Sequence, residues 1–251
     1  MEKQLLPVIA GPTASGKTAV AAELCRLIGG EVVSADSMQV YSGMDILTAQ
    51  PSEEETLGVP HHMLGCVEPS RYYTADAYRE DAKACISAIA ARGRVSVLCG
   101  GTGLYIDAVT RPMSFSQRSD PDLHRELLTL AEAPGGRERL HRMLEEIDPP
   151  SAGRLHENDV RRVARAIEIY RLTGITQTEH TRRDRERKGD YDEMIFGLMW
   201  PREALCRRID ARVDAMLAAG LVEEVRALMV DARRHPTAVQ AIGYKEIAAA
   251  L

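Results

Sequence analysis

The sequence predicts an α/β fold in which a parallel sheet with flanking helices carries a mostly helical insertion. Three observations lead to this prediction. Four short apolar runs have the length and composition of buried strands, and helical patterns lie between them. The character of the chain then changes after Arg111, where a polar linker leads into two segments of opposite charge. The four runs are residues 5–10, 31–35, 94–99 and 194–200.

Composition excludes several classes of protein. The 251 residues are 45% hydrophobic, which suffices for one large domain or one domain with an insertion. The net charge of −5 argues against a wholly basic nucleic-acid binder. The five cysteines are scattered without a C-x-x-C pair, which indicates reduced thiols in a cytoplasm. No apolar stretch has the roughly 20 residues of a membrane span, so we expect no membrane attachment.

The first apolar run leads into a phosphate-binding motif. The next eight residues fit G-x-x-x-x-G-K-[ST], and a helical pattern follows them. The glycines let several backbone N–H groups face one anion, and the helix adds its positive end. The lysine adds a charge, and the last hydroxyl suits Mg²⁺. A chance glycine turn would not need this strand and helix context. The motif therefore predicts a P-loop NTPase-like core. Its residues are Gly11, Pro12, Thr13, Ala14, Ser15, Gly16, Lys17 and Thr18.

Two further strand ends carry polar residues. Asp36 follows the second run, at the sheet edge where ligands bind in parallel α/β proteins. It could be a base, a metal partner or a helix cap. The third run ends in Gly100-Gly101-Thr102, where nucleotide hydrolases usually place an acid for Mg²⁺. This ending suits close backbone approach and a hydroxyl contact, although Thr102 could equally be a helix cap. His61-His62 lacks a third ligand at a helpful spacing, which argues against a metal site.

The insertion covers residues 113–193. Asp120 to Asp148 is helical and acidic, with 8 acidic and 4 basic residues, and Pro149-Pro150 ends it. Arg154 to Lys188 carries 10 basic and 6 acidic residues. It contains a helix, Val160 to Leu172, whose Arg161, Arg162 and Arg165 lie off the apolar stripe. These arginines form either a solvated face or a contact with nucleic acid. Residues 178–188 are polar throughout, and we expect them to be mobile.

The core comprises residues 1–112 and 194–251. After the fourth run, a helix starts at Pro201 and carries Arg208 and Arg212. It ends near Gly220, and a further helix follows at Leu221 to Met229.

Six segments together resemble the tRNA dimethylallyltransferases, also called tRNA isopentenyltransferases. The resemblance covers nearly the whole chain in order and is far more specific than the phosphate-binding motif alone. The segments are GPTASGKT (11–18), SADSMQVYSGMDILTAQPS (34–52), HHMLG (61–65), VLCGGTGLYIDAV (97–109), NDVRRVARAIEIY (158–170) and QAIGYKE (240–246).

The resemblance implies a reaction and its partners. The dimethylallyl group of dimethylallyl diphosphate passes to N6 of the adenosine immediately 3′ of the anticodon, in tRNAs that read codons beginning with U. Mg²⁺ is implied at Thr18, the base at Asp36 and a partner hydroxyl at Thr102. Arg208 and Arg212 are implied near the diphosphate. We expect a monomer that binds the anticodon stem-loop. The implied tRNA contacts are Asp36, Ser37, Met38, Gln39, Gln117, Arg161, Arg162, Val163, Ala164, Arg165, Gln240, Ala241, Ile242, Gly243, Tyr244 and Lys245.

Three alternatives stay open at this point. A P-loop small-molecule or nucleotide kinase would share the motif, but Gly100-Gly101-Thr102 stands where its acid is expected. A non-catalytic tRNA-binding module would lack turnover. Relatives that prenylate free adenine nucleotides would not need a basic insertion. Family members continue past the G-Y-K element with a basic helical stretch, and we expect part of their tRNA contact to lie there.

Overall fold

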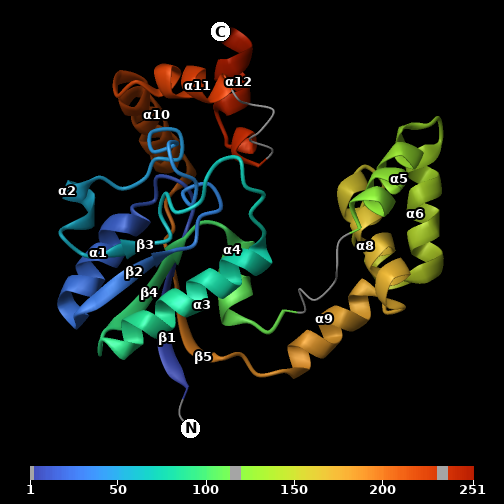
Figure 1. Cartoon of the computed structure of the whole chain (residues 1–251), viewed down its shortest axis with the longest axis horizontal. Helices are drawn as coiled ribbons and strands as arrows, with labels where there is room; N and C mark the ends of the chain where they lie inside the picture. Colours follow the sequence, from blue (N-terminus) through green and yellow to red (C-terminus); the bar gives the residue numbers. More distant parts are fainter. Residues whose placement is uncertain (1–2, 114–119, 231–236) are drawn as a thin grey trace. The chain divides into compact units, whose positions relative to one another are not determined.

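The structure of the chain is a computed structural model that describes residues 3–113, 120–230 and 237–251 (Figure 1). The chain divides into two compact units. The sheet unit comprises Met1–Thr110 and Asp190–Leu251, and the helical unit comprises Arg111–Gly189. The predicted boundaries at 112/113 and 193/194 therefore need correction. Residues 190–193 belong to the sheet unit because Tyr191 already pairs with Gln4 at the edge of the sheet.

The sheet unit is built on five parallel strands in the order β3-β2-β4-β1-β5, which confirms the predicted α/β class. Two-residue β3 was not predicted, because it is too short to show a pattern. The fourth run forms a strand three residues earlier than expected. The strands are β1 (Gln4–Ala10), β2 (Gly30–Ser34), β3 (His61–His62), β4 (Val95–Gly100) and β5 (Tyr191–Gly197).

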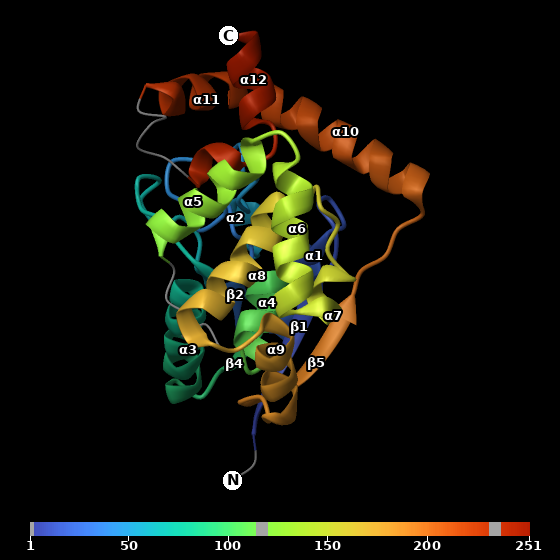
Figure 2. The ribbon, with the colours of Figure 1, turned by 90° about the vertical axis from the view of Figure 1, so that its right-hand side faces the viewer.

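Helices cover the sheet with apolar side chains. On one face, Ala21 and Cys25 of α1 pack with Ile9 of β1. On the other, a larger cluster includes Tyr78 of α3 and Ile106 of α4. Helices α11 and α12 lie side by side near the end of α10 (Figures 1 and 2). The helices of this unit are α1 (Lys17–Ile28), α2 (Glu53–Thr56), α3 (Ala75–Ala91), α4 (Gly103–Thr110), α10 (Arg202–Ala218), α11 (Leu221–Met229), α12 (Tyr244–Ala250) and the 3₁₀ turn η2 (Ala238–Gln240).

The strand order indicates at which edge of the sheet a ligand binds. After β1 the chain moves through α1 to β2, and β4 then returns between them. After β4 the chain passes to β5 on the other side of β1. The order thus reverses between β1 and β4, and ligands of open α/β sheets bind at such a reversal, outside the carboxyl ends of the strands.

The helical unit has a core of its own. Leu127, Leu140, Leu144 and Ile167 are almost fully buried in it. The acidic segment forms two helices rather than one, because Gly135 takes a left-handed conformation (φ 68°) between them. Pro149 begins a short helix rather than only ending one, since proline suits the first helical turn. The helices are α5 (Pro121–Glu132), α6 (Gly136–Ile147), α7 (Pro149–Ala152), α8 (Val160–Thr173) and α9 (Gln177–Glu186).

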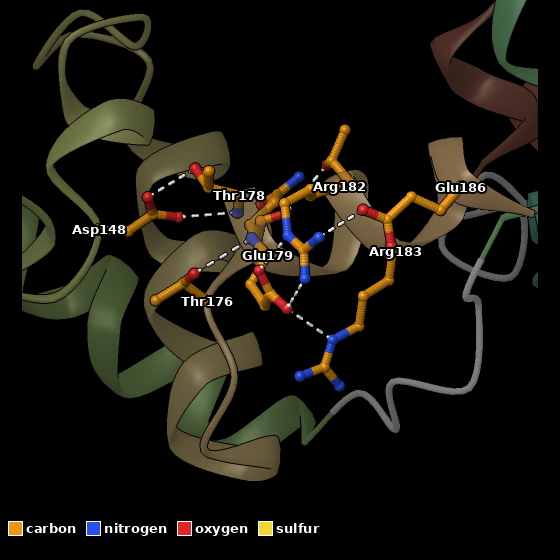
Figure 3. A network of polar contacts seen from close by, with 9 residues as sticks. Asp148, Thr176, Thr178, Glu179, Arg182, Arg183 and Glu186 are labelled. Carbon is orange, nitrogen blue, oxygen red and sulfur yellow. Dashed lines mark hydrogen bonds and ion pairs between the residues drawn. The ribbon is translucent and has the colours of Figure 1, made fainter.

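The stretch 178–188 was expected to be mobile, and most of it forms helix α9 (Figure 3). Its start is capped by the Thr176 hydroxyl, which accepts a hydrogen bond from the Glu179 N–H at 3.2 Å. Glu179 pairs with Arg182 at 2.8 Å and Arg183 at 2.7 Å, one helical turn away. Capping and ion pairs therefore support a helix that has no apolar stripe.

The start of α9 is also fixed to α7 by a buried carboxylate (Figure 3). Asp148 accepts hydrogen bonds from the Thr178 N–H at 3.0 Å and from the hydroxyls of Thr178 and Ser151. Burial alone would raise the pKa of Asp148, but these hydrogen bonds outweigh it and hold that pKa below its usual value.

A second buried carboxylate organises α8 in the helical unit. Glu168 is fully buried and lies 2.8 Å from Arg165. It also accepts hydrogen bonds from the Asp120 N–H at 2.9 Å and, at 3.0 Å, contacts the ring of His124. Removing one partner of a buried ion pair leaves the other charge uncompensated, which is strongly destabilising. Arg165 therefore helps to hold the helical unit together, whatever else it binds.

Candidate active site

The phosphate-binding loop connects β1 to α1 and has a strained backbone. Ala14 and Gly16 both take left-handed conformations, with φ of 60° and 90°. Such alternation turns backbone N–H groups toward one concavity, where an anion can bind. Ser15 is only 3% exposed, and its hydroxyl has no hydrogen-bond partner within the described ranges. A buried polar group without a partner costs free energy, so the loop is suited to a polar ligand.

Close backbone approach explains the glycines around the loop. A Cβ on Gly100 would lie 2.1 Å from the carbonyl oxygen of Ala35, so no side chain fits there. A Cβ on Gly101 would lie 3.3 Å from the Gly11 carbonyl oxygen. The ends of β1, β2 and β4 thus meet in a space that admits only glycine at position 100 and leaves little room for a side chain at position 101.

Lys17 points its ammonium group into this space. Nζ donates a hydrogen bond to the Pro12 carbonyl at 2.7 Å and lies 3.7 Å from a Cβ built on Gly101. Burial lowers the pKa of Lys17, the neighbouring Asp36 carboxylate opposes this shift, and the Arg212 guanidinium adds to it. Asp36 and Arg212, from two other segments, are therefore close enough to Lys17 to affect its pKa.

The surroundings of Asp36 are compatible with two of the roles that its position left open, the cap and the base. Its Oδ1 accepts hydrogen bonds from the N–H groups of Met38 at 2.9 Å and Gln39 at 3.3 Å, which is a capping role. No described residue donates a hydrogen bond to Oδ2. One oxygen therefore fixes the turn, and the other remains available to accept a proton.

Thr102 uses its hydroxyl to join two strand ends. Its Oγ1 accepts a hydrogen bond from the Ser37 N–H at 3.0 Å and lies 3.3 Å from the Ser37 hydroxyl. Its carbonyl accepts the first hydrogen bonds of α4. Thr102 thus stands at the start of the helix, but its side chain connects the β4 turn to the Asp36 turn. A direct bond between Thr102 and Asp36 is not present in the structure.

Helix α10 brings two arginines to the same edge. Arg208 Nε donates a hydrogen bond to the Ala14 carbonyl at 2.7 Å, and its guanidinium lies 4.5 Å from the centre of the Trp200 ring. Arg212, one turn later, donates to the Ala49 carbonyl at 3.0 Å. Helix geometry puts residues four apart on one face, so both cations face the loop side of α10.

The described residues contain no group of three or more His, Cys, Asp or Glu side chains that could hold a metal ion. His62 instead contacts the buried carboxylate of Glu31 at 2.6 Å, and His61 contacts the Val59 carbonyl at 2.8 Å. Thr18 follows Lys17 at the start of α1, and its hydroxyl has no described hydrogen-bond partner.

The residues predicted to contact tRNA in the sheet unit have different environments. Ser37 and Met38 lie in the Asp36 turn and are partly exposed. The Gln39 side chain is already engaged, since its amide donates to the Thr48 and Ala49 carbonyls. In the C-terminal segment, Gln240, Ile242 and Lys245 are exposed, Gly243 is partly exposed, and the side chains of Ala241 and Tyr244 are buried.

Two of the predicted contacts in the helical unit have buried side chains. Val163 and Ala164 are 1% and 0% exposed, because they face the core of the unit, so a contact with tRNA at these positions would have to involve the backbone. Arg161 and Arg162 are exposed on α8, and Arg162 lies 3.7 Å from Asp159. Gln117 lies outside the described residues.

Two residues that support the site were not singled out from the sequence. The Trp200 indole donates a hydrogen bond to the Ser15 carbonyl at 2.9 Å. Glu224 of α11 accepts hydrogen bonds from the N–H groups of Ile46 and Leu47 and so fixes the segment that precedes Ala49. The sequence offers one feature by which Trp200 could have been found, because it is the only tryptophan of the chain.

Comparison with known proteins decides the family. The model of a family described as IPP transferase matches residues 39–251, which is most of the chain.

The chain belongs to the IPP transferase family.

Relatives in this family are similar over most of their length. A tRNA dimethylallyltransferase from Geobacillus kaustophilus is 46% identical over 240 residues, which cover 96% of this chain and 76% of the relative. One from Geobacter metallireducens is 46% identical over 253 residues, covering 100% of this chain and 81% of the relative. Both relatives are named as transferases, which supports a transferase rather than the alternative, a P-loop kinase.

Solved structures of the IPP transferase family have a similar fold. The full-length tRNA isopentenylpyrophosphate transferase from Bacillus halodurans is 40% identical, with a TM-score of 0.68 over 98% of this chain and 77% of that chain. A eukaryotic dimethylallyltransferase acting on tRNA is 30% identical, with a TM-score of 0.75 over 90% of this chain and 56% of that chain. None of the helices in the described ranges is long and apolar enough to cross a membrane.

Proposed function

We propose that this chain transfers the dimethylallyl group of dimethylallyl diphosphate to N6 of the adenosine 3′ of the anticodon, in tRNAs that read codons beginning with U. The observation that carries the proposal, beside the family membership, is the Asp36 carboxylate at the anion-binding edge. One of its oxygens fixes the turn, the other accepts no hydrogen bond from the described residues, and the carboxylate is near enough to Lys17 to oppose the lowering of its pKa. An anion site for the leaving group and a base for the nucleophile thus lie at one edge of the sheet.

The chemistry assigns a task to each group. The bond between C1 of the dimethylallyl group and the diphosphate oxygen breaks while C1 bonds to N6 of the adenine. The N6 lone pair is delocalised into the ring, so a carboxylate that takes its proton helps most as the new bond forms. Asp36 Oδ2 receives that proton. Lys17 and the loop N–H groups stabilise the charge that develops on the departing diphosphate.

Magnesium fits the donor set without a carboxylate cluster. Mg²⁺ is commonly held by one or two protein oxygens together with substrate phosphates and water. The Thr18 hydroxyl and the diphosphate oxygens would supply such a set. When bound, the ion would neutralise charge on the leaving diphosphate.

The adenosine must leave its base stack to reach the Asp36 turn. Enzymes that act on a base generally extrude it into a pocket and hold the surrounding nucleic acid elsewhere. Exposed Arg161 and Arg162 of the helical unit are suited to the phosphates of the anticodon stem-loop. We propose that the helical unit holds the stem-loop and that the chain acts as a monomer in the cytoplasm.

A transfer assay tests the function. Radiolabelled dimethylallyl diphosphate is incubated with the chain, Mg²⁺ and an anticodon stem-loop that carries the target adenosine. Label is expected in the RNA, but not in a matched stem-loop with guanosine at that position. Adenosine monophosphate replaces the RNA in a second arm, and radiolabelled ATP replaces the donor in a third. Label in adenosine monophosphate alone, or phosphoryl transfer from ATP, would contradict the proposal.

The RNA contact is tested by the double variant Arg161→Ala/Arg162→Ala. Both side chains are exposed, so the variant is expected to fold like the parent, and Arg165 is left in place because it pairs with buried Glu168. Removing one arginine that binds a phosphate should reduce the slope of log K against log salt by about 0.7–0.9. The slope is measured by stem-loop binding at several salt concentrations.

The matched control for this measurement is Arg139→Ala/Arg142→Ala, which removes two exposed charges from α6 of the same unit. It should leave the slope nearly unchanged. Equal slopes for the parent and the α8 variant would mean that Arg161 and Arg162 form only a solvated face.

A further inference from the structure

Two consecutive carbonyls of the phosphate-binding loop are held from outside the loop. The Ala14 carbonyl accepts a hydrogen bond from Arg208 Nε at 2.7 Å. The Ser15 carbonyl accepts one from Trp200 Nε1 at 2.9 Å. Both donors come from the segment that follows β5, so the loop is tied to a part of the chain far away in sequence.

These bonds set the direction of a loop N–H. The peptide bonds of the structure are trans, so the C=O and N–H of one peptide point in opposite directions. The Ser15 carbonyl and the Gly16 N–H belong to the same peptide. Because Trp200 holds the carbonyl, the Gly16 N–H, which directly precedes α1, is directed away from the indole. An anion at a helix start is bound by such N–H groups.

The loop backbone needs this support. Ala14 has φ of 60°, a left-handed conformation that is costly for a residue with a Cβ. Strained residues of this kind persist only where their surroundings fix them. The two hydrogen bonds are made to the carbonyls of Ala14 and of Ser15, the next residue. They therefore fix the orientation of the peptides that follow the strained residue.

Trp200 also fixes the Arg208 guanidinium. The guanidinium carbon lies 4.5 Å from the ring centre, a distance at which a cation is attracted to the face of an indole. With Nε on the Ala14 carbonyl, the terminal nitrogens of Arg208 remain available, and Nη2 lies 3.6 Å from a Cβ built on Gly16. The indole ring therefore holds the Arg208 guanidinium beside the Ser15–Gly16 peptide, and the indole N–H orients that same peptide.

We propose that Trp200 is a positioning residue for the diphosphate of the donor. It acts through two groups, the Ser15–Gly16 peptide and the Arg208 guanidinium, and does not touch the reacting atoms. This inference rests on the proposed function for the identity of the donor, but the diphosphate contact itself does not depend on the RNA. Trp200 is 43% exposed, so its role is not that of a core residue.

Two substitutions separate its two contacts. Trp200→Phe keeps an aromatic face for Arg208 but removes the indole N–H, and Trp200→Leu removes both. A neutral hydrogen bond is worth about a fivefold change in binding, and loss of the stack adds to it. We expect dissociation constants for inorganic diphosphate with Mg²⁺ to rise about fivefold for Trp200→Phe and more for Trp200→Leu. Calorimetry measures them. Met199→Ala, which changes a neighbouring side chain that is 93% exposed, should bind like the parent.

Further measurements distinguish a positioning role from general stability. The KM for dimethylallyl diphosphate should rise in both Trp200 variants, while the KM for the stem-loop and the melting temperature stay close to those of the parent. Arg208→Lys combined with Trp200→Leu, which removes the ring under the guanidinium, should weaken binding by less than the product of the two single effects, because the two residues act together. As the only tryptophan, Trp200 should also change its emission when inorganic diphosphate is added to the parent.

Unchanged diphosphate binding in both Trp200 variants, or strictly additive effects with Arg208→Lys, would overturn the inference. Failure of the proposed function gives a different result. In that case no variant, nor the parent, transfers the dimethylallyl group to RNA, while the differences in diphosphate binding between parent and Trp200 variants remain. A Trp200→Leu variant that does not fold still leaves Trp200→Phe and the fluorescence titration as tests.

Discussion

Asp36→Asn is expected to lower turnover by roughly 10²–10⁴-fold, the range for loss of a general base. Asparagine keeps an amide oxygen at the position of Oδ1, which accepts from the Met38 and Gln39 N–H groups, so the turn should persist. Its NH₂ then stands where Oδ2 was and cannot accept the N6 proton. Single-turnover transfer with saturating donor and stem-loop measures the effect, and stem-loop affinity should stay within a few fold.

The control for this substitution is Asp45→Asn, which removes an exposed carboxylate from the same connecting segment. It should transfer at the rate of the parent. If Asp36→Asn turned over at a near-normal rate, Asp36 would have only its capping role, and the proton acceptor would have to be sought among other groups.

Lys17→Ala is expected to slow transfer by about 10²–10³-fold, as for the loss of one preorganised group that stabilises developing charge. Nζ lies within the glycine-lined space between the β1 and β4 ends, where the leaving diphosphate is proposed to bind. The dissociation constant of dimethylallyl diphosphate should rise as well. Single-turnover rates and calorimetry separate the two effects.

Matched variants identify which charge matters. Lys3→Ala removes an exposed charge at the opposite end of β1 and should leave both measurements unchanged. Thr18→Ala should raise the Mg²⁺ concentration needed for half-maximal rate, because the hydroxyl proposed for the ion is gone. Normal donor binding and rate in Lys17→Ala would exclude this loop as the donor site.

Local pattern and topology together made much of this arrangement predictable. In a parallel sheet the carboxyl ends of the strands share one edge, so the motif after β1, Asp36 after β2 and Thr102 after β4 had to converge. The glycines at Gly100 and Gly101 follow from the same convergence, because three backbones meet there. The geometry added how Asp36 divides its two oxygens, which no sequence pattern contains.

Other features depended on contacts that sequence patterns do not show. Trp200 reaches Ser15 only because β5 lies beside β1, and Glu224 reaches Ile46 only through the placement of α11. Helix α9 lacks the apolar stripe on which helix prediction depends, and a cap at Thr176 with ion pairs of Glu179 replaces it. Contacts between segments distant in sequence thus position Trp200 and Glu224, and a cap with ion pairs stabilises α9.

The pairing of Gln4 with Tyr191 sets the order in which the protein can form during synthesis. β1 leaves the ribosome well before β5, and its outer edge stays open until the whole helical unit and then Tyr191–Gly197 have been made. An open strand edge is a template for wrong pairing. The helical unit has mostly local contacts and can fold during that interval, whereas the sheet cannot be completed. Since Trp200 and Arg208 follow β5, the nascent chain acquires the outer support of its anion-binding loop only after β5 has been made.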